Sequence, residues 1–136
     1  KFSIKEMGTK KNVLIIEDEK DLLDSYKELV ETAGYTAFTA SDGYQGLDFL
    51  AQNLGKVDIL LLDLMMPGVD GLEVLRAIKT NEGKYGKFPV IILTNMTSES
   101  VIRESFTLGA SSYLVKTDLD YDGLVKELGR YIGESE

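Results

Sequence analysis

The sequence contains no cysteine and no histidine among its 136 residues, and each absence excludes a class of chemistry. Without cysteine the chain has no disulfides, no thiolate metal sites and no cysteine nucleophile. Without histidine it lacks the imidazole ligands of most zinc sites and the commonest general base. Any metal held by side chains is therefore expected to have oxygen ligands.

Long apolar runs and clusters of positive charge are also missing. No apolar run approaches the length of a membrane span, and the first residues, KFSIKEMGTKK, lack the apolar segment of a signal peptide. We therefore expect a cytoplasmic protein with no membrane partner. The net charge of −8 disfavours direct binding of nucleic acid, whose phosphates attract clustered lysine and arginine.

Apolar runs alternate with amphipathic stretches along the whole chain, and 43% of the residues are hydrophobic. The apolar runs predict strands over 12–16, 35–40, 57–63, 88–95 and 111–116. Helical spacing follows each strand, with 80–87 predicted as a loop and Leu54 as an inward-facing residue of the second helix. Five such strand–helix units predict a single α/β domain with a parallel sheet covered on both faces.

Polar residues follow four of the predicted strands. Glu17 and Asp18 follow the first strand, Asp63 ends the third, Thr94 the fourth and Lys116 the fifth. Each has an ordinary interpretation: acids favour the positive end of a helix, Asp63 can cap a turn, and a threonine or lysine at a strand end is common. Because ligands of parallel α/β sheets bind at the carboxyl ends of the strands, the coincidence favours a functional site.

Clustered carboxylates repel one another unless a cation neutralises them. Oxygen ligands without histidine or cysteine suit Mg²⁺, which keeps several waters and accepts phosphate oxygens. We predict Asp18 and Asp63 as direct ligands, the Met65 backbone carbonyl as a further one, and Glu17 as a ligand through water. Such an ion would also draw off charge as a phosphoryl group reaches Asp63.

Taken together, these residues resemble the receiver domain of bacterial two-component response regulators, including chemotaxis receivers. The resemblance covers residues 11–133 and leaves tails at 1–10 and 134–136. It implies a flavodoxin-like, doubly wound (βα)5 fold with a five-stranded parallel sheet in the order 2-1-3-4-5. It rests on the Glu17-Asp18 pair, Asp63 with MMPGVDG at 65–71, Thr94, and the run from Tyr113 to Lys116.

The resemblance also implies a function. A sensor histidine kinase or a histidine phosphotransfer protein would pass a phosphoryl group to Asp63, Lys116 would pair with that group, and Thr94 would hydrogen-bond to it. The domain would catalyse only its own phosphorylation and slow dephosphorylation. Thr94 and Tyr113 would act as a switch for the face at 98–132, which would bind an effector or form a weak homodimer. Tyr113 is alternatively an ordinary half-buried strand tyrosine.

The chain departs from the family pattern at a few positions. Thr117 follows the lysine where proline is usual, and we predict a trans peptide between Lys116 and Thr117. Asn95 follows the threonine where a small residue is common. Met65 and Met96 occupy the positions that tune phosphoryl lifetime in the family, and neither side chain can orient a hydrolytic water, which favours slow self-dephosphorylation.

Two other functions remain open on a similar fold. A flavin-binding module needs a phosphate-binding loop after the first strand, where this chain has the acidic run EDEKD at 17–21. A magnesium-dependent phosphatase that forms an aspartyl phosphate usually has a second aspartate two residues after the nucleophile, where this chain has Met65.

Overall fold

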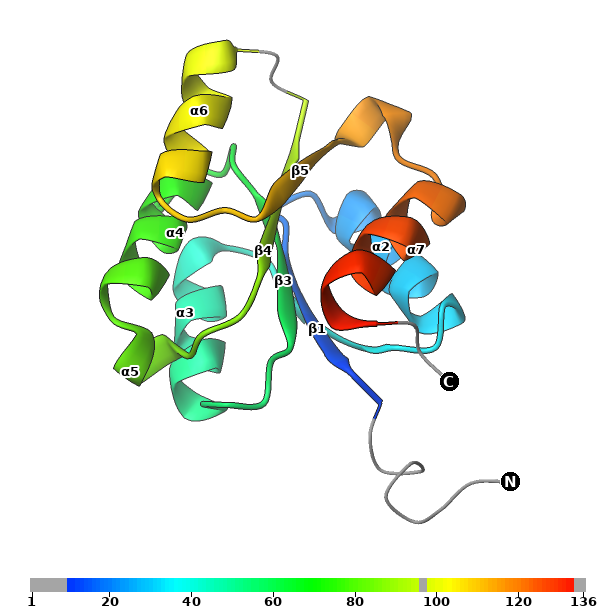
Figure 1. Ribbon diagram of the computed structural model, residues 1–136, viewed down its shortest axis with the longest axis horizontal. Coiled ribbons are helices and arrows are strands. Elements are labelled where there is room, and N and C mark those ends of the chain that lie inside the picture. The colour runs from blue at the N-terminus through cyan, green and yellow to red at the C-terminus, as the bar shows by residue number, and fades with distance from the viewer. Residues whose placement is uncertain (1–9, 96–97, 134–136) are drawn as a thin grey trace.

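The computed structural model of the chain describes residues 10–95 and 98–133 (Figure 1). Most of the predicted tail at 1–10, the tail at 134–136 and Met96 lie outside the described residues. The strands are β1 (Asn12–Ile16), β2 (Thr36–Ala40), β3 (Ile59–Asp63), β4 (Val90–Thr94) and β5 (Ser112–Val115). The helices are α2 (Lys20–Thr32), α3 (Gly43–Gln52), α4 (Gly71–Thr80), α5 (Glu82–Tyr85), α6 (Glu99–Thr107), α7 (Tyr121–Ile132) and the 3-10 helix η1 (Lys116–Asp118).

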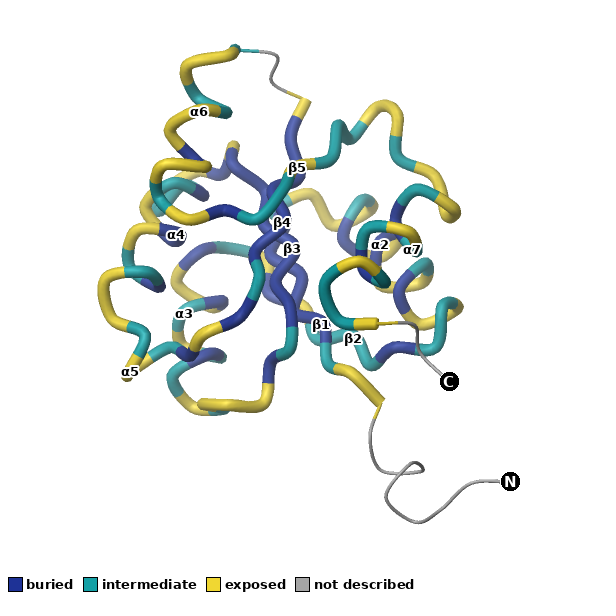
Figure 2. Tube along the Cα trace, in the orientation of Figure 1, coloured by how far each residue is buried: buried dark blue, intermediate teal, exposed yellow. Residues whose placement is uncertain are grey.

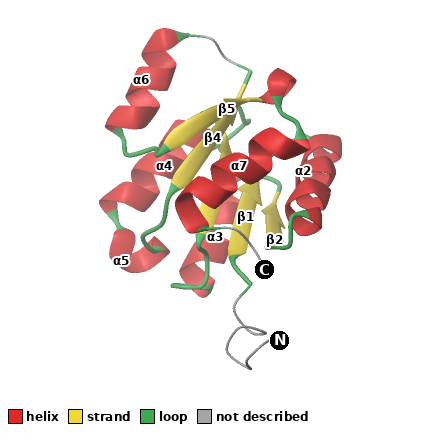
Figure 3. Cartoon of the chain, turned by 45° about the vertical axis from the view of Figure 1, so that its right-hand side comes forward, coloured by secondary structure: helices red, strands yellow, loops and turns green. Residues whose placement is uncertain are grey.

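The strands form one parallel sheet in the order β2-β1-β3-β4-β5, which confirms the predicted doubly wound fold. Because parallel neighbours need a crossover connection, each pair of consecutive strands is joined through helix. Helices α2 and α7 cover one face of the sheet, and α3, α4, α5 and α6 lie on the other (Figures 1 and 3).

The strand side chains divide between two hydrophobic cores, one on each face of the sheet. In β1, Val13 and Ile15 pack under α2 and α7, whereas Leu14 and Ile16 pack on the other face. Successive residues of a strand point to opposite faces, which is why one continuous apolar run supplies both cores. Every residue of β3 and β4 is buried, so the centre of the sheet is the driest part of the molecule (Figure 2).

Two details of the predicted fold are wrong. The segment predicted as a loop at 80–87 contains the short helix α5. Leu54, predicted to face inward, is 52% exposed because α3 ends at Gln52 and the chain turns through Gly55, whose φ is +82°. Helical spacing therefore does not predict the burial of a residue that lies beyond the end of the helix. The described residues contain no cis peptide bond, in agreement with the predicted trans Lys116–Thr117 bond.

In the part of the chain that the structure describes, no helix combines the length and the apolar character that crossing a membrane requires.

Candidate functional site

Strand alternation brings Glu17, Asp63 and Lys116 to the same face of the sheet. Ile16 of β1 is paired with Leu62 of β3, so the acid that follows each of them lies at the same level of the sheet. Because alternate residues of a strand point to the same face of the sheet, each charged residue lies on the same face as the residue two positions before it. Those earlier residues are apolar and belong to the core under α2 and α7: Ile15, Leu61 and Leu114.

A single ammonium group lies between two buried carboxylates. Lys116 Nζ is 2.7 Å from Glu17 Oε1 and 3.0 Å from Asp63 Oδ1. The side chains are almost withdrawn from water, with exposures of 10% for Lys116, 0% for Glu17 and 1% for Asp63. At such low exposure a charge is tolerated only when an opposite charge meets it, so Lys116 is the partner that both acids require.

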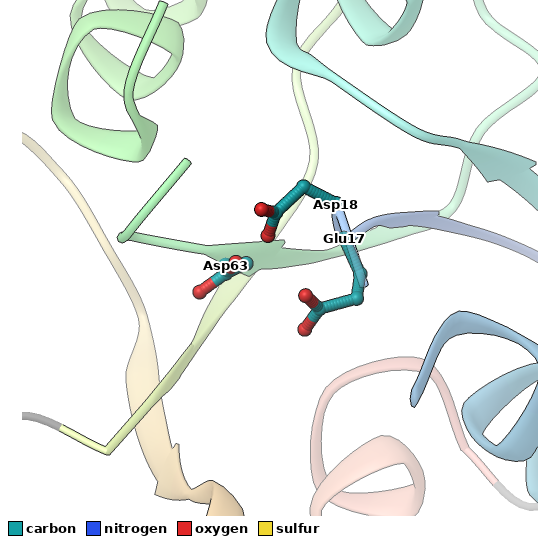
Figure 4. Close-up of side chains that lie close together, drawn as sticks. All are labelled: Glu17, Asp18 and Asp63. Atoms are coloured by element: carbon teal, nitrogen blue, oxygen red, sulfur yellow. The ribbon is translucent and has the colours of Figure 1, made fainter. Parts of the chain in front are cut away.

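Asp18 adds a third carboxylate to this cluster. One carboxylate oxygen from each of Glu17, Asp18 and Asp63 lies within 4.8 Å of the others, and Figure 4 shows the side chains close together at the strand ends. One lysine cannot balance three carboxylates. The cluster therefore keeps a surplus of negative charge, which favours a cation or protonation of an acid.

Backbone groups bind one oxygen of each buried acid and leave the other oxygen without a backbone donor. Glu17 Oε2 accepts a hydrogen bond from the Glu19 N–H at 3.0 Å, and Asp63 Oδ1 accepts one from the Met65 N–H at 3.2 Å. Asp63 Oδ2 is buried and has no hydrogen-bond partner among the described residues. A buried carboxylate oxygen without a donor is costly, and it marks a place where a further positive or donor group fits.

The turn after Asp63 is fixed by the start of α4. A Cβ atom on Gly71 would lie 2.4 Å from the Asp63 carbonyl oxygen and 2.6 Å from Leu64 Cα, so only glycine allows this approach. Asp70 caps α4 by accepting from the Glu73 N–H, and the Glu73 side chain accepts from the Asp70 N–H. Helix α4 thus begins directly against the backbone of the acid.

The charges of the cluster shift its protonation. Burial raises the pKa of Asp63 to about 7, the Glu17 and Asp18 carboxylates add to the rise, and the Lys116 ammonium opposes it. Burial alone would lower the pKa of Lys116, but the ion pairs with Glu17 and Asp63 outweigh it and raise that pKa. Lys116 therefore stays charged near neutral pH, whereas Asp63 is poised to exchange a proton or a cation.

The two predicted switch residues lie on β4 and β5. Thr94 is buried at the end of β4, one residue beyond the partner of Asp63 in the sheet, Leu93. Tyr113 is 41% exposed, and its ring packs edge-to-face on Phe106 of α6 with 6.2 Å between centroids. Tyr113 thus points away from the core in this structure and contacts the helix that a switch on this face would move.

One residue that the sequence did not connect with the site is Tyr26. Tyr26 lies on α2, is 4% exposed, and has a buried hydroxyl without a hydrogen-bond partner among the described residues. Burial first, and then the charges of Glu17, Asp63 and Glu19, raise the pKa of Tyr26 to about 12, against the effect of Lys116. Spacing in the sequence gave no signal of this, because a tyrosine in an apolar stripe usually belongs to the core.

The fold and the site define a doubly wound α/β domain with a carboxylate–lysine cluster at the carboxyl ends of its strands. The sequence matches the family model of the response regulator receiver domain over residues 13–128. The chain belongs to this family, whose members are signalling domains of two-component systems.

Individual proteins show the same relationship. The transcriptional regulatory protein CpxR of Escherichia coli is 38% identical over 104 residues, which cover 76% of this chain and 42% of CpxR. The transcriptional regulatory protein CrdR of Helicobacter pylori is 32% identical over 124 residues, which cover 91% of this chain and 56% of CrdR. The chain thus spans about half the length of these curated relatives.

Solved structures resemble the whole domain. The chemotaxis protein CheY4 of Vibrio cholerae superposes with a TM-score of 0.82 at 29% identity, covering 91% of this chain and 100% of CheY4. A response regulator receiver domain protein from Clostridium thermocellum gives a TM-score of 0.76 at 31% identity, covering 84% of this chain and 87% of the other. The described fold is therefore the fold of receiver domains.

The raised pKa of Asp63 should make the free energy of unfolding depend on pH. Between the ordinary carboxyl pKa of 3.8 and the folded pKa of about 7, the folded state binds a proton that the unfolded state has lost, so the fold loses stability as pH rises through this window and stays weakened above it. In magnesium-free buffer, Asp63→Asn should raise the free energy of unfolding by roughly 1–3 kcal/mol at about pH 8. The gain should shrink toward about pH 5, as measured by urea denaturation.

The matched control for this experiment is Asp48→Asn, which alters an exposed carboxylate on α3. A difference between wild type and Asp63→Asn that stays the same at both pH values would contradict the assignment of the shift to Asp63.

Proposed function

We propose that this receiver domain accepts a phosphoryl group on Asp63 from the phosphohistidine of a sensor histidine kinase or a histidine phosphotransfer protein. The observation that carries the proposal is the state of the Asp63 carboxylate: Oδ1 is paired with Lys116, and Oδ2 is buried without a hydrogen-bond partner among the described residues. Both oxygens of Glu17 are engaged, by the Glu19 N–H and by the Lys116 charge. Of the buried acids, Asp63 therefore offers the oxygen with the fewest polar contacts.

The chemistry is the transfer of a phosphoryl group from a histidine nitrogen of the donor to a carboxylate oxygen of Asp63. Asp63 Oδ2 would form a bond to phosphorus while the P–N bond of the donor breaks, and the electron pair leaves with the donor imidazole, which then takes a proton. Lys116 is already 3.0 Å from Asp63 Oδ1 and would pair with the negative phosphoryl oxygens. Thr94, buried at the end of the neighbouring strand, would hydrogen-bond to one of them.

The acidic cluster also fits a magnesium ion, because its donors are carboxylates and Asp63 Oδ2 is buried without a hydrogen-bond partner in the part of the chain that the structure describes. Asp18 and Asp63 would be direct ligands, Glu17 would act through water, and the Met65 carbonyl would be a further ligand. The Met65 backbone lies beside the acid, since its N–H donates to Asp63 Oδ1. When bound, the ion would supply positive charge against the repulsion between carboxylates and phosphoryl oxygens.

The output would be a change in the surface formed by α6, β5 and α7. Thr94 and Tyr113 lie on β4 and β5, so a group on Asp63 acts first on the elements that these strands contact. Tyr113 in its outward position packs on Phe106 of α6, and an inward position would remove that contact. A switch requires two arrangements close in energy, and the phosphoryl group would shift their populations. This surface would then bind an effector or form a weak homodimer.

The domain would act in the cytoplasm as a signalling switch and would catalyse only its own phosphorylation and slow dephosphorylation. Neither direct contact with nucleic acid nor contact with a membrane is part of the proposal. The acidic residues after β1 would repel the phosphate of a flavin, and Met65 cannot serve as the acid–base group of a phosphatase.

We predict that Asp63 is the sole phosphorylation site. Acetyl phosphate with magnesium should add one phosphoryl group to wild type and none to Asp63→Asn, as seen in the mass of the intact protein. Asp48→Asn, on the exposed side of α3, should be modified like wild type. Equal modification of wild type and Asp63→Asn would refute the assignment.

Magnesium binding should be weak and should depend on Asp18, because several ligands of this ion remain water. Asp18→Ala should lose both magnesium binding, measured by calorimetry, and phosphorylation. Without magnesium the same variant should unfold at a higher temperature than wild type, since it has less carboxylate repulsion. The control is Asp21→Ala, which alters an exposed acid on α2 and should bind magnesium normally. Normal phosphorylation of Asp18→Ala would show that the metal site lies elsewhere.

The proposed output surface predicts where the protein responds to a phosphoryl analogue. Beryllium fluoride with magnesium should change amide hydrogen exchange at the end of β4 and in α6, β5 and the start of α7. Asp63→Asn under the same conditions should show no change. Responses confined to α2 and α3 would contradict the proposed surface.

A further inference from the structure

Tyr26 carries a hydroxyl group that is unusual for the core in which it lies. Its side chain extends from α2 into the core formed with apolar residues of β1, β3 and α7, and the hydroxyl oxygen is buried without a partner among the described residues. Tyr35 belongs to the same core, yet its hydroxyl donates to the Gly133 carbonyl at 2.8 Å. Because buried tyrosine hydroxyls usually find a partner, the lone Tyr26 hydroxyl requires an explanation.

The Tyr26 hydroxyl lies in the electrostatic field of the acidic cluster. The charges of Lys116, Glu17 and Asp63 all act on it. Helix α2 begins at Lys20, directly after the acids that follow β1, and helical side chains lean toward the N-terminal end of their helix. The tyrosine therefore extends from the core toward the end of the sheet where the cluster lies.

Glu17 offers the complementary acceptor. Its Oε1 atom lies 2.7 Å from Lys116 Nζ, which supplies its counter-charge, and no other donor among the described residues meets it. Glu17 Oε1 thus depends on Lys116 alone, whereas the Tyr26 hydroxyl is a buried donor without a partner among the described residues, and both lie on the face of the sheet under α2. Tyrosine can donate while it stays neutral, so it can satisfy a carboxylate without adding charge.

The Lys116 ammonium pairs with both Glu17 and Asp63, and phosphorylation of Asp63 would change the balance between these two ion pairs. A phosphoryl group on Asp63 carries more negative charge than the carboxylate it replaces, and it would draw the ammonium toward itself. Glu17 would then lose its direct partner and keep only the charge of the magnesium ion, which reaches it through water, and a fully buried carboxylate in that state is unfavourable unless a donor meets it.

We propose that Tyr26 is a positioning residue that donates a hydrogen bond to Glu17 when Lys116 turns to a phosphoryl group on Asp63. This inference rests on the proposed function. The hydroxyl stays unpaired in the resting domain and becomes paired only in the phosphorylated one. Tyr26 therefore stabilises the phosphorylated state selectively, which a residue with a purely structural role in the core would not do.

The test compares Tyr26→Phe with Tyr35→Phe, which removes a hydroxyl that is already paired in the same core. Beryllium fluoride with magnesium serves as the phosphoryl analogue, and its affinity is measured beside the melting temperature of the free protein. Tyr26→Phe should leave that temperature unchanged or raised and should weaken beryllium fluoride binding about tenfold. Tyr35→Phe should lower the melting temperature and leave the affinity within about twofold of wild type.

Three outcomes would overturn the inference. The first is wild-type affinity in Tyr26→Phe, and the second is an equal loss of affinity in both variants. The third is a melting temperature of free Tyr26→Phe as low as that of Tyr35→Phe, which would show that the Tyr26 hydroxyl is already paired at rest. Failure of the proposed function is a separate result: wild type itself would not bind beryllium fluoride, and the inference would fall with it.

Discussion

The site depends on one interaction, the sharing of the Lys116 ammonium between the buried carboxylates of Glu17 and Asp63. Removing the lysine would leave both carboxylates with neither water nor a counter-charge, a loss that typically costs about 3–5 kcal/mol for a buried ion pair. The lysine therefore determines whether two acids can occupy the dry ends of β1 and β3. It does not satisfy them completely, since oxygens of both acids lack hydrogen bonds among the described residues.

That incomplete satisfaction is what connects the structure with the proposed function. A cluster that was fully balanced would gain little from a magnesium ion or a phosphoryl group. Here Asp18 adds negative charge, the pKa of Asp63 is raised to about 7, and Asp63 Oδ2 has no donor within residues 10–95 and 98–133. The resting domain is thus less stable than its core would allow, and groups that bind the cluster can lower its free energy.

Much of this arrangement was predictable from the sequence, because it follows from two periodic rules. Continuous apolar runs predicted the parallel sheet, and the residue after each run predicted Glu17, Asp63 and Lys116 at one edge. Local spacing could not reveal groups that meet only through packing between elements. The Tyr26 hydroxyl near the cluster depends on how α2 lies on the sheet, and the exposure of Leu54 depends on where α3 ends.

The most direct measurement is a crystal structure of the protein with magnesium and beryllium fluoride. We expect the beryllium fluoride group on Asp63, with Lys116 Nζ in contact with a fluoride and magnesium between Asp18 and Asp63. An adduct on Glu17 or Asp18, or a Lys116 side chain without any contact to the bound group, would contradict the central role of the shared ammonium.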